Sequence, residues 1–74
     1  MTLKDIGVGK SAKVIKINSN DEKFKIRMTD MGFVPGCIVN VKRVAPLGDP
    51  IQVSLHGYEL SLGKSEAGSI EVEL

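Results

Sequence analysis

Two neighbouring segments near the end of the chain alternate apolar and polar residues without interruption. Ile51–Leu55 reads Ile-Gln-Val-Ser-Leu and Tyr58–Leu62 reads Tyr-Glu-Leu-Ser-Leu. Alternation with a period of two is typical of strands that bury one face. His56 and Gly57 alone separate the two segments, and two residues that include a glycine suit the tight turn of a β-hairpin. The sequence therefore predicts an antiparallel hairpin here, and this commits the chain to a sheet.

Three further segments are expected to extend this sheet. Ser11–Ile17 and Ile38–Val44 are rich in the β-branched residues Val and Ile, and Ile70–Leu74 alternates to its end. A chain of 74 residues has room for one domain with one core. Five short strands without a strand–helix–strand crossover predict a mostly β fold. We expect a small, partly open antiparallel barrel in a single domain, residues 1–74, with one short inserted helix.

The inserted helix is expected between the first two strands. Ser19-Asn-Asp-Glu22 matches a capping box, in which the Ser19 side chain covers a free backbone N–H and Glu22 reaches back. Gly32 suits the position just past a helix end. The apolar residues between them have the spacing of one helix face: Phe24, Met28 and Met31. These patterns predict a helix of about ten residues.

The charges are unevenly distributed, although the formal net charge is only +1 at pH 7. Nine of the ten Lys and Arg residues precede Ala45, whereas five of the nine Asp and Glu residues follow it. In a small barrel the first and last strands lie side by side, so we expect Lys13 and Lys16 to face Glu71 and Glu73. The alternative is a basic surface for a polyanion, which a net charge so close to zero does not favour.

No combination of residues typical of catalysis or metal binding occurs in the sequence. His56 is the only histidine and Cys37 the only cysteine. A structural zinc site needs four ligands, and a cysteine nucleophile needs a neighbouring base. The glycines do not form a phosphate-binding loop. We therefore expect no enzymatic activity, no metal site and no cofactor, with His56 a solvated turn residue and Cys37 a half-buried strand residue.

The N-terminal residues lack the apolar core of a signal peptide, and no apolar run has the length of a membrane helix. A single cysteine suits a reducing compartment, because it forms no internal disulfide framework. The sequence thus predicts a soluble cytoplasmic protein.

The connection between the second and third predicted strands, Arg43–Ile51, combines two prolines, a glycine and an aspartate. Each proline fixes φ at about −65° and restricts the residue before it. The glycine tolerates positive φ, and the aspartate can bond its own backbone in a turn. Leu47 stands in the middle of this connection, where a simple linker would favour a polar residue. A rigid loop with an apolar tip favours docking to another molecule.

A second apolar group is expected where the predicted helix ends. Met28, Met31, Phe33 and Val34 precede a turn at Pro35, and methionine is common on adaptable contact surfaces. The alternative is that the two methionines fill the barrel core. With only two Phe and one Tyr, the chain offers little for the stacking platforms of nucleic-acid-binding barrels or for a groove that binds proline-rich peptides.

Three motifs follow one another along the chain: Met31-Gly-Phe-Val-Pro-Gly36, then Arg43-Val-Ala-Pro-Leu-Gly-Asp-Pro-Ile51, then Leu60-Ser-Leu62. In this order they resemble the FeoA family, small cytosolic accessory proteins of bacterial ferrous iron transport. The resemblance implies an SH3-like β-barrel with an inserted helix. It also implies a partner, FeoB, a membrane protein with a cytosolic GTPase domain that carries Fe(II) uptake. A related domain is found at the C-terminal end of iron- or manganese-dependent repressors.

One segment departs from the family pattern. Leu62-Gly63-Lys64 stands where many relatives have Leu-Arg-Lys. A role of that arginine in contacting a partner therefore does not carry over to this chain.

Two functions remain as alternatives. The first is a non-enzymatic adaptor that binds the cytosolic part of FeoB and supports or regulates transport, with Leu47 inserted into the partner. The expected contact residues are Pro46, Leu47, Gly48, Asp49 and Pro50, with Met31 and Phe33 adjoining. The second is a freestanding regulatory domain that associates with a metal-dependent transcriptional repressor. Direct nucleic-acid binding is a weaker third, and an uncovered edge strand would allow a homo-oligomer.

Overall fold

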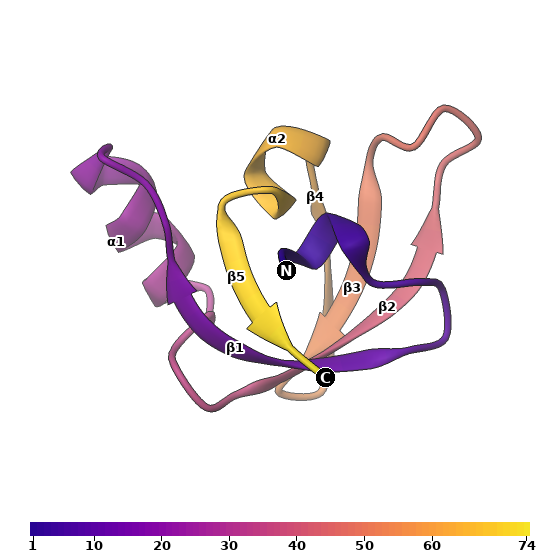
Figure 1. Ribbon diagram of the computed structural model, residues 1–74, viewed down its shortest axis with the longest axis horizontal. Coiled ribbons are helices and arrows are strands. Elements are labelled where there is room, and N and C mark those ends of the chain that lie inside the picture. Colours follow the sequence, from indigo (N-terminus) through magenta and orange to yellow (C-terminus); the bar gives the residue numbers. More distant parts are fainter.

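The computed structural model describes residues 1–74 and is built on one five-stranded antiparallel sheet (Figure 1). The strands are β1 (Ser11–Ile17), β2 (Ile38–Val44), β3 (Ile51–Leu55), β4 (Tyr58–Leu62) and β5 (Ile70–Glu73). The helical elements are η1 (Leu3–Asp5), α1 (Glu22–Asp30) and α2 (Lys64–Ala67). The strand order is β4-β3-β2-β1-β5. The predicted mostly β fold is confirmed, with all five strands present and α1 inserted between the first two.

Register shifts in two strand pairs bend the sheet. One lies between Val14 and Lys16, where β1 pairs with β5, and the other between Val41 and Arg43, where β2 pairs with β3. Irregularities of this kind bend a strand and increase its local twist. In Figure 1 the curved sheet has β5 on one side and β2 with β3 on the other. The barrel is open because β4 and β5, at the two ends of the strand order, are not paired.

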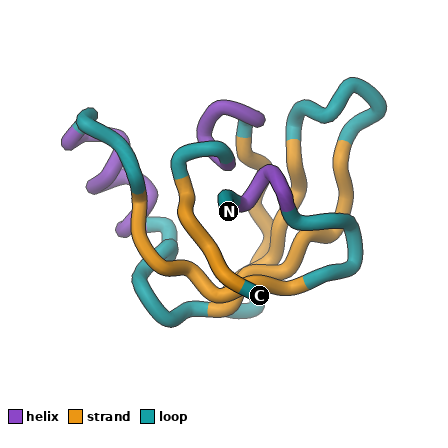
Figure 2. Tube along the Cα trace, in the orientation of Figure 1, coloured by secondary structure: helices purple, strands orange, loops and turns teal.

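Two short helical turns fill the opening of the barrel. Figure 2 shows η1 and α2 between the two sides of the curved sheet. Leu3 in η1 and Ala67 in α2 are both fully buried. The N-terminus also pairs with β5, since the Val72 N–H donates to the Met1 carbonyl at 3.0 Å. The outer edge of β4 has no strand partner. None of the helices combines the length and apolar character that crossing a membrane requires.

Helix α1 begins differently from the predicted capping box. Asp21 is the N-cap residue, and its carboxylate accepts hydrogen bonds from the backbone N–H groups of Lys23 and Phe24 at 3.0 and 3.3 Å. The Ser19 hydroxyl instead accepts from the Asp21 N–H at 3.1 Å. The capping box of Ser19 and Glu22 is therefore wrong. An aspartate caps a helix as well as a serine does, and here it lies directly before the first turn.

The core consists of 15 buried residues, all of them apolar. Met28 is 1% exposed, and Phe24 and Met31 are half-buried and pack against the same cluster. The predicted apolar face of α1 thus packs against the barrel. The alternative that a methionine fills the core holds for Met28. Gly32 follows the helix with φ of 107°, the left-handed region that a glycine adopts without strain.

The charged pairs expected between the first and last strands are in register. Lys13 lies opposite Glu73, and Lys16 lies opposite Glu71. Cross-strand neighbours of opposite sign stabilise a sheet modestly. Two cations of the first strand thus lie opposite two carboxylates of the last strand, although neither pair is among the ion pairs of the protein.

The predicted hairpin turn between β3 and β4 is confirmed. His56 and Gly57 have φ of 52° and 83°, and Leu55 pairs with Tyr58 across the turn. Positive φ at both central residues is the type I′ geometry that suits the twist of a hairpin. His56 is exposed as expected, but it is not a free turn residue, because its Nε2 lies 3.1 Å from the Gly32 carbonyl oxygen.

Candidate functional site

The loop between β2 and β3 closes on itself through two backbone hydrogen bonds. The Ala45 N–H donates to the Pro50 carbonyl at 3.1 Å, and the Gly48 N–H donates to the Ala45 carbonyl at 2.7 Å. Gly48 has φ of 84°, and the Asp49–Pro50 peptide bond is cis. The backbone of this loop therefore has a defined shape that does not depend on burial of its side chains.

Leu47 projects from the loop into solvent. Its side chain is 92% exposed, the largest exposed fraction of any large apolar residue in the protein. Pro46, Asp49 and Pro50 are exposed as well, and Gly48 is half-buried. The loop thus carries an apolar tip outside the core and is not a buried corner of the barrel.

A side chain within the loop anchors it to α2. The Asp49 Oδ1 accepts a hydrogen bond from the Lys64 backbone N–H at 3.0 Å. Lys64 is the first residue of α2, and the first N–H groups of a helix have no partner within the helix. The bond therefore satisfies such a group and fixes the loop against α2. Sequence patterns gave no signal for it, because the two residues lie 15 positions apart.

Met31 and Phe33 do not adjoin this loop. Both residues precede β2, whereas the loop follows it. The seven residues of β2 therefore lie between them and the loop, and at the rise of a strand these residues span about 20 Å. Phe33 is fully buried in the core, and Met31 is half-buried. Figure 1 shows the end of α1 and the β2–β3 loop on opposite sides of the molecule. The expectation that both residues adjoin the loop on one contact surface is therefore wrong, and burial removes Phe33 from any surface.

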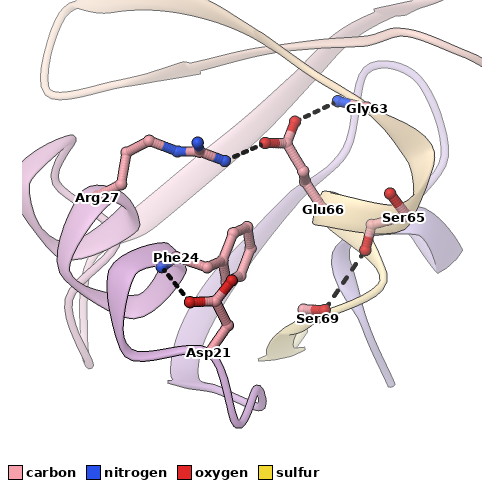
Figure 3. A network of polar contacts seen from close by, with 7 residues as sticks. All are labelled: Asp21, Phe24, Arg27, Gly63, Ser65, Glu66 and Ser69. Carbon is pink, nitrogen blue, oxygen red and sulfur yellow. Dashed lines mark hydrogen bonds and ion pairs between the residues drawn. The ribbon is translucent and has the colours of Figure 1, made fainter.

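A polar network joins α1 to α2 (Figure 3). The Arg27 guanidinium donates to the Glu66 Oε2 at 2.7 Å, and the Glu66 Oε1 accepts from the Gly63 backbone N–H at 2.8 Å. The Arg27 side chain is 60% exposed and that of Glu66 31%, so solvent screens the ion pair, which contributes at most about 1 kcal/mol. Its main effect is to orient Glu66, which caps the start of α2.

The hollow beside this network has a volume of about 230 Å³. Its lining residues come from α1, α2 and the segments next to them: Ser19, Asp21, Phe24, Ser65, Glu66 and Ser69. The carboxylate of Asp21 caps α1, and that of Glu66 bonds Gly63 and Arg27. The Ser69 hydroxyl donates to the Ser65 carbonyl at 3.4 Å. The two carboxylates thus already have partners within the protein, and the contact of Glu66 with Arg27 joins the two helices.

Cys37 is half-buried, as expected, and forms no disulfide. No group of three or more His, Cys, Asp or Glu side chains is placed to hold a metal ion. The pKa of Asp5 lies below its usual value because the Thr2 backbone N–H donates to the carboxylate at 2.9 Å. This carboxylate therefore stabilises η1, the first helical turn of the chain.

The geometry thus presents an exposed apolar tip at the β2–β3 loop, and comparison with known proteins identifies the family. The FeoA domain model matches residues 1–74. An Fe(2+) transport protein A/Fe(2+) transporter FeoB fusion protein of Porphyromonas gingivalis is 35% identical over 74 residues, which are 100% of this chain and 9% of the relative. The chain therefore corresponds to less than a tenth of that fusion protein.

Solved structures share the whole fold. The FeoA-like protein of Clostridium acetobutylicum superposes with a TM-score of 0.89 at 40% identity, over 100% of this chain and 85% of that one. The FeoA of Stenotrophomonas maltophilia, crystallised with zinc and described as a prokaryotic SH3 domain protein, superposes with a TM-score of 0.87 at 28% identity, over 99% of this chain and 89% of that one.

A manganese-dependent transcriptional repressor contains a domain of the same shape, with a TM-score of 0.89 over 100% of this chain and 36% of the repressor. At 21% identity this likeness shows the fold alone. Since the FeoA model covers every residue and the FeoA structures share the complete SH3-like barrel, the chain belongs to the FeoA family.

Proposed function

We propose that this protein is a non-enzymatic adaptor of ferrous iron uptake in the cytoplasm. It binds the cytosolic part of a FeoB-type membrane GTPase transporter and supports or regulates Fe(II) transport. The fusion protein of Porphyromonas gingivalis supports this pairing, because a FeoA segment and a FeoB segment are joined there in one chain. Joining two proteins raises their effective concentration for one another, which benefits partners that act together.

The exposed side chain of Leu47 is the observation that carries the proposal. Full burial of a leucine side chain is worth about 1.5–3 kcal/mol, and Leu47 gains almost none of this in the free protein because it is 92% exposed. A partner with an apolar pocket recovers that free energy. The loop is already closed by its own hydrogen bonds, so docking orders few additional groups, and this lowers the entropic cost of binding.

The proposed contact surface is the loop tip: Pro46, Leu47, Gly48, Asp49 and Pro50. Leu47 inserts into the partner, and the two prolines keep the backbone in its docking conformation. Asp49 holds the loop on α2 through the Lys64 N–H. Met31 and Phe33 take no part in this surface, since they lie beyond the other end of β2.

The test is a titration of the purified cytosolic GTPase domain of the cognate transporter with wild-type protein and with Leu47→Ala. We expect the variant to bind about tenfold or more weakly, which corresponds to a loss of about 1.4 kcal/mol. Ile26→Ala is the matched control, because Ile26 is also an exposed aliphatic side chain, 59% exposed, on α1 away from the loop.

Both variants are expected to remain folded, since neither side chain belongs to the buried core. Amide spectra of the free proteins check this point. Equal affinity of wild type and a folded Leu47→Ala variant would remove the loop from the proposed interface.

A further inference from the structure

The surface next to Leu47 carries a cation, the ammonium group of Lys64. The Nζ atom of Lys64 lies 3.9 Å from the position that a Cβ atom on Gly48 would occupy. Gly48 follows Leu47 directly in the chain. The ammonium group of this first residue of α2 therefore lies next to Gly48, the residue that follows the apolar tip.

The backbone contacts explain why these two groups stay together. The Asp49 Oδ1 accepts from the Lys64 N–H at 3.0 Å, which ties the α-carbon of the lysine to the loop. Asp49 is the only carboxylate between β2 and β3. Through this hydrogen bond to the Lys64 N–H, the carboxylate holds the backbone of Lys64 next to the loop.

The ammonium group of Lys64 has no carboxylate partner. The two ion pairs of the protein are Lys25 with Glu22, and Arg27 with Glu66. The Lys64 Nζ takes part in neither ion pair and in no side-chain hydrogen bond. Its charge is therefore available to another molecule that approaches the loop.

We infer that the docking site on the partner is an apolar pocket with a carboxylate at its rim, and that this carboxylate pairs with Lys64 when Leu47 fills the pocket. The inference rests on the proposed function and specifies the chemistry of the same surface. An opposite charge at the rim steers the partners together and fixes the orientation in which the pocket meets the tip. A polyanion or an anionic membrane is a poorer match, because the side chain at the tip is apolar and the carboxylate of Asp49 lies beside it.

The loop end of β2 adds to this electrostatic match. Lys42 and Arg43 are both exposed at the base of the loop. Together with Lys64 they give the loop region three cations, against the carboxylates of Asp49 and of Glu66, of which Glu66 is already paired with Arg27. The resulting excess of positive charge favours an acidic partner surface around the pocket.

The experiment measures affinity and its salt dependence for the purified cytosolic GTPase domain with Lys64→Glu, Lys64→Arg and Lys23→Glu. Lys23→Glu changes the net charge by the same amount at an exposed position of α1. We expect Lys64→Glu to weaken binding about tenfold and to flatten its dependence on salt, since a local ion pair is screened by added ions. Lys64→Arg and Lys23→Glu are expected to bind as wild type does.

Each outcome separates the inference from the proposed function. Equal affinities of Lys64→Glu and Lys23→Glu would overturn the local ion pair, and the adaptor role would stand as long as Leu47→Ala still loses binding. Loss of binding by Lys64→Glu alone supports the acidic rim. The backbone N–H that Asp49 bonds is present in all variants, so amide spectra are expected to show the loop in its wild-type conformation.

Discussion

The Tyr58 hydroxyl donates a hydrogen bond of 2.5 Å to the Met31 carbonyl and so joins the β3–β4 hairpin to the end of α1. His56 in the same hairpin lies with its Nε2 3.1 Å from the Gly32 carbonyl oxygen. Because a carbonyl only accepts, the Nε2 atom carries the hydrogen. The carbonyl groups at a helix end lack partners within the helix. The hairpin turn therefore acts as a cap for the segment that leaves α1.

Tyr58→Phe removes this hydrogen bond and retains the ring. We expect the free energy of unfolding to fall by about 0.5–1.5 kcal/mol, the net value of one such bond. Urea denaturation of the two proteins measures the difference. The alternative follows from the 44% exposure of Tyr58. An unchanged urea midpoint would mean that water replaces the hydroxyl at the Met31 carbonyl without a loss of stability.

Gly32→Ala is expected to destabilise the protein for two reasons. Gly32 has φ of 107°, and a Cβ atom there would lie 2.6 Å from the His56 Cδ2. Gly36 has φ of 93°, and a Cβ atom there would meet no atom within 4 Å. Gly36→Ala therefore measures the cost of the left-handed backbone conformation alone, which is about 1–3 kcal/mol. Thermal unfolding should show the larger loss for Gly32→Ala. If both variants lose the same stability, the histidine ring moves aside freely.

Asp49→Ala is expected to release the loop from α2, because it removes the acceptor of the Lys64 N–H. Asp49→Asn keeps a side-chain oxygen in the same place and serves as the control. Hydrogen exchange at the Lys64 amide should become faster in the alanine variant and remain close to wild type in the asparagine variant. Slow exchange in both would show that another group protects this amide.

Acidification is expected to remove the contribution of Asp5 to stability. The pKa of Asp5 is lowered in the folded state, first by the hydrogen bond from the Thr2 backbone N–H. The unfolded chain then binds more protons at acidic pH, so the contribution is complete above the unfolded pKa and is lost as the pH falls through the folded pKa. Below about pH 4, stability should therefore decline less steeply in Asp5→Asn than in the wild type. Parallel curves from urea denaturation at several pH values would contradict this assignment.

The strands were predictable because their signal is local. The alternation in Ile51–Leu55 and Tyr58–Leu62 follows from burial of one sheet face, and the structure buries Val53 and Leu62 while it exposes Glu59 and Ser61. The start of α1 was not resolved by the same means. Ser19 and Asp21 are both good N-cap residues, and the choice between them depends on where the chain leaves β1.

The candidate site was predictable only in part. The prolines and the glycine around Leu47 indicated a rigid loop, and the structure places the leucine in solvent. Whether Phe33 lies inside or outside depends on tertiary packing, which has no local pattern in the sequence. The anchor between Asp49 and Lys64 likewise joins residues from different elements.

The self-closed loop between β2 and β3 has a consequence for how this family can diversify. Its hydrogen bonds run between Ala45, Gly48 and Pro50, and the side chain of Leu47 supports nothing beneath it. In the proposed interface, the side chain that inserts into the partner, that of Leu47, is therefore separate from the groups that shape the loop. Exchanging the loop tip for that of a homologue should transfer partner choice while leaving the barrel intact, so the recognition element behaves as an interchangeable module on a constant scaffold.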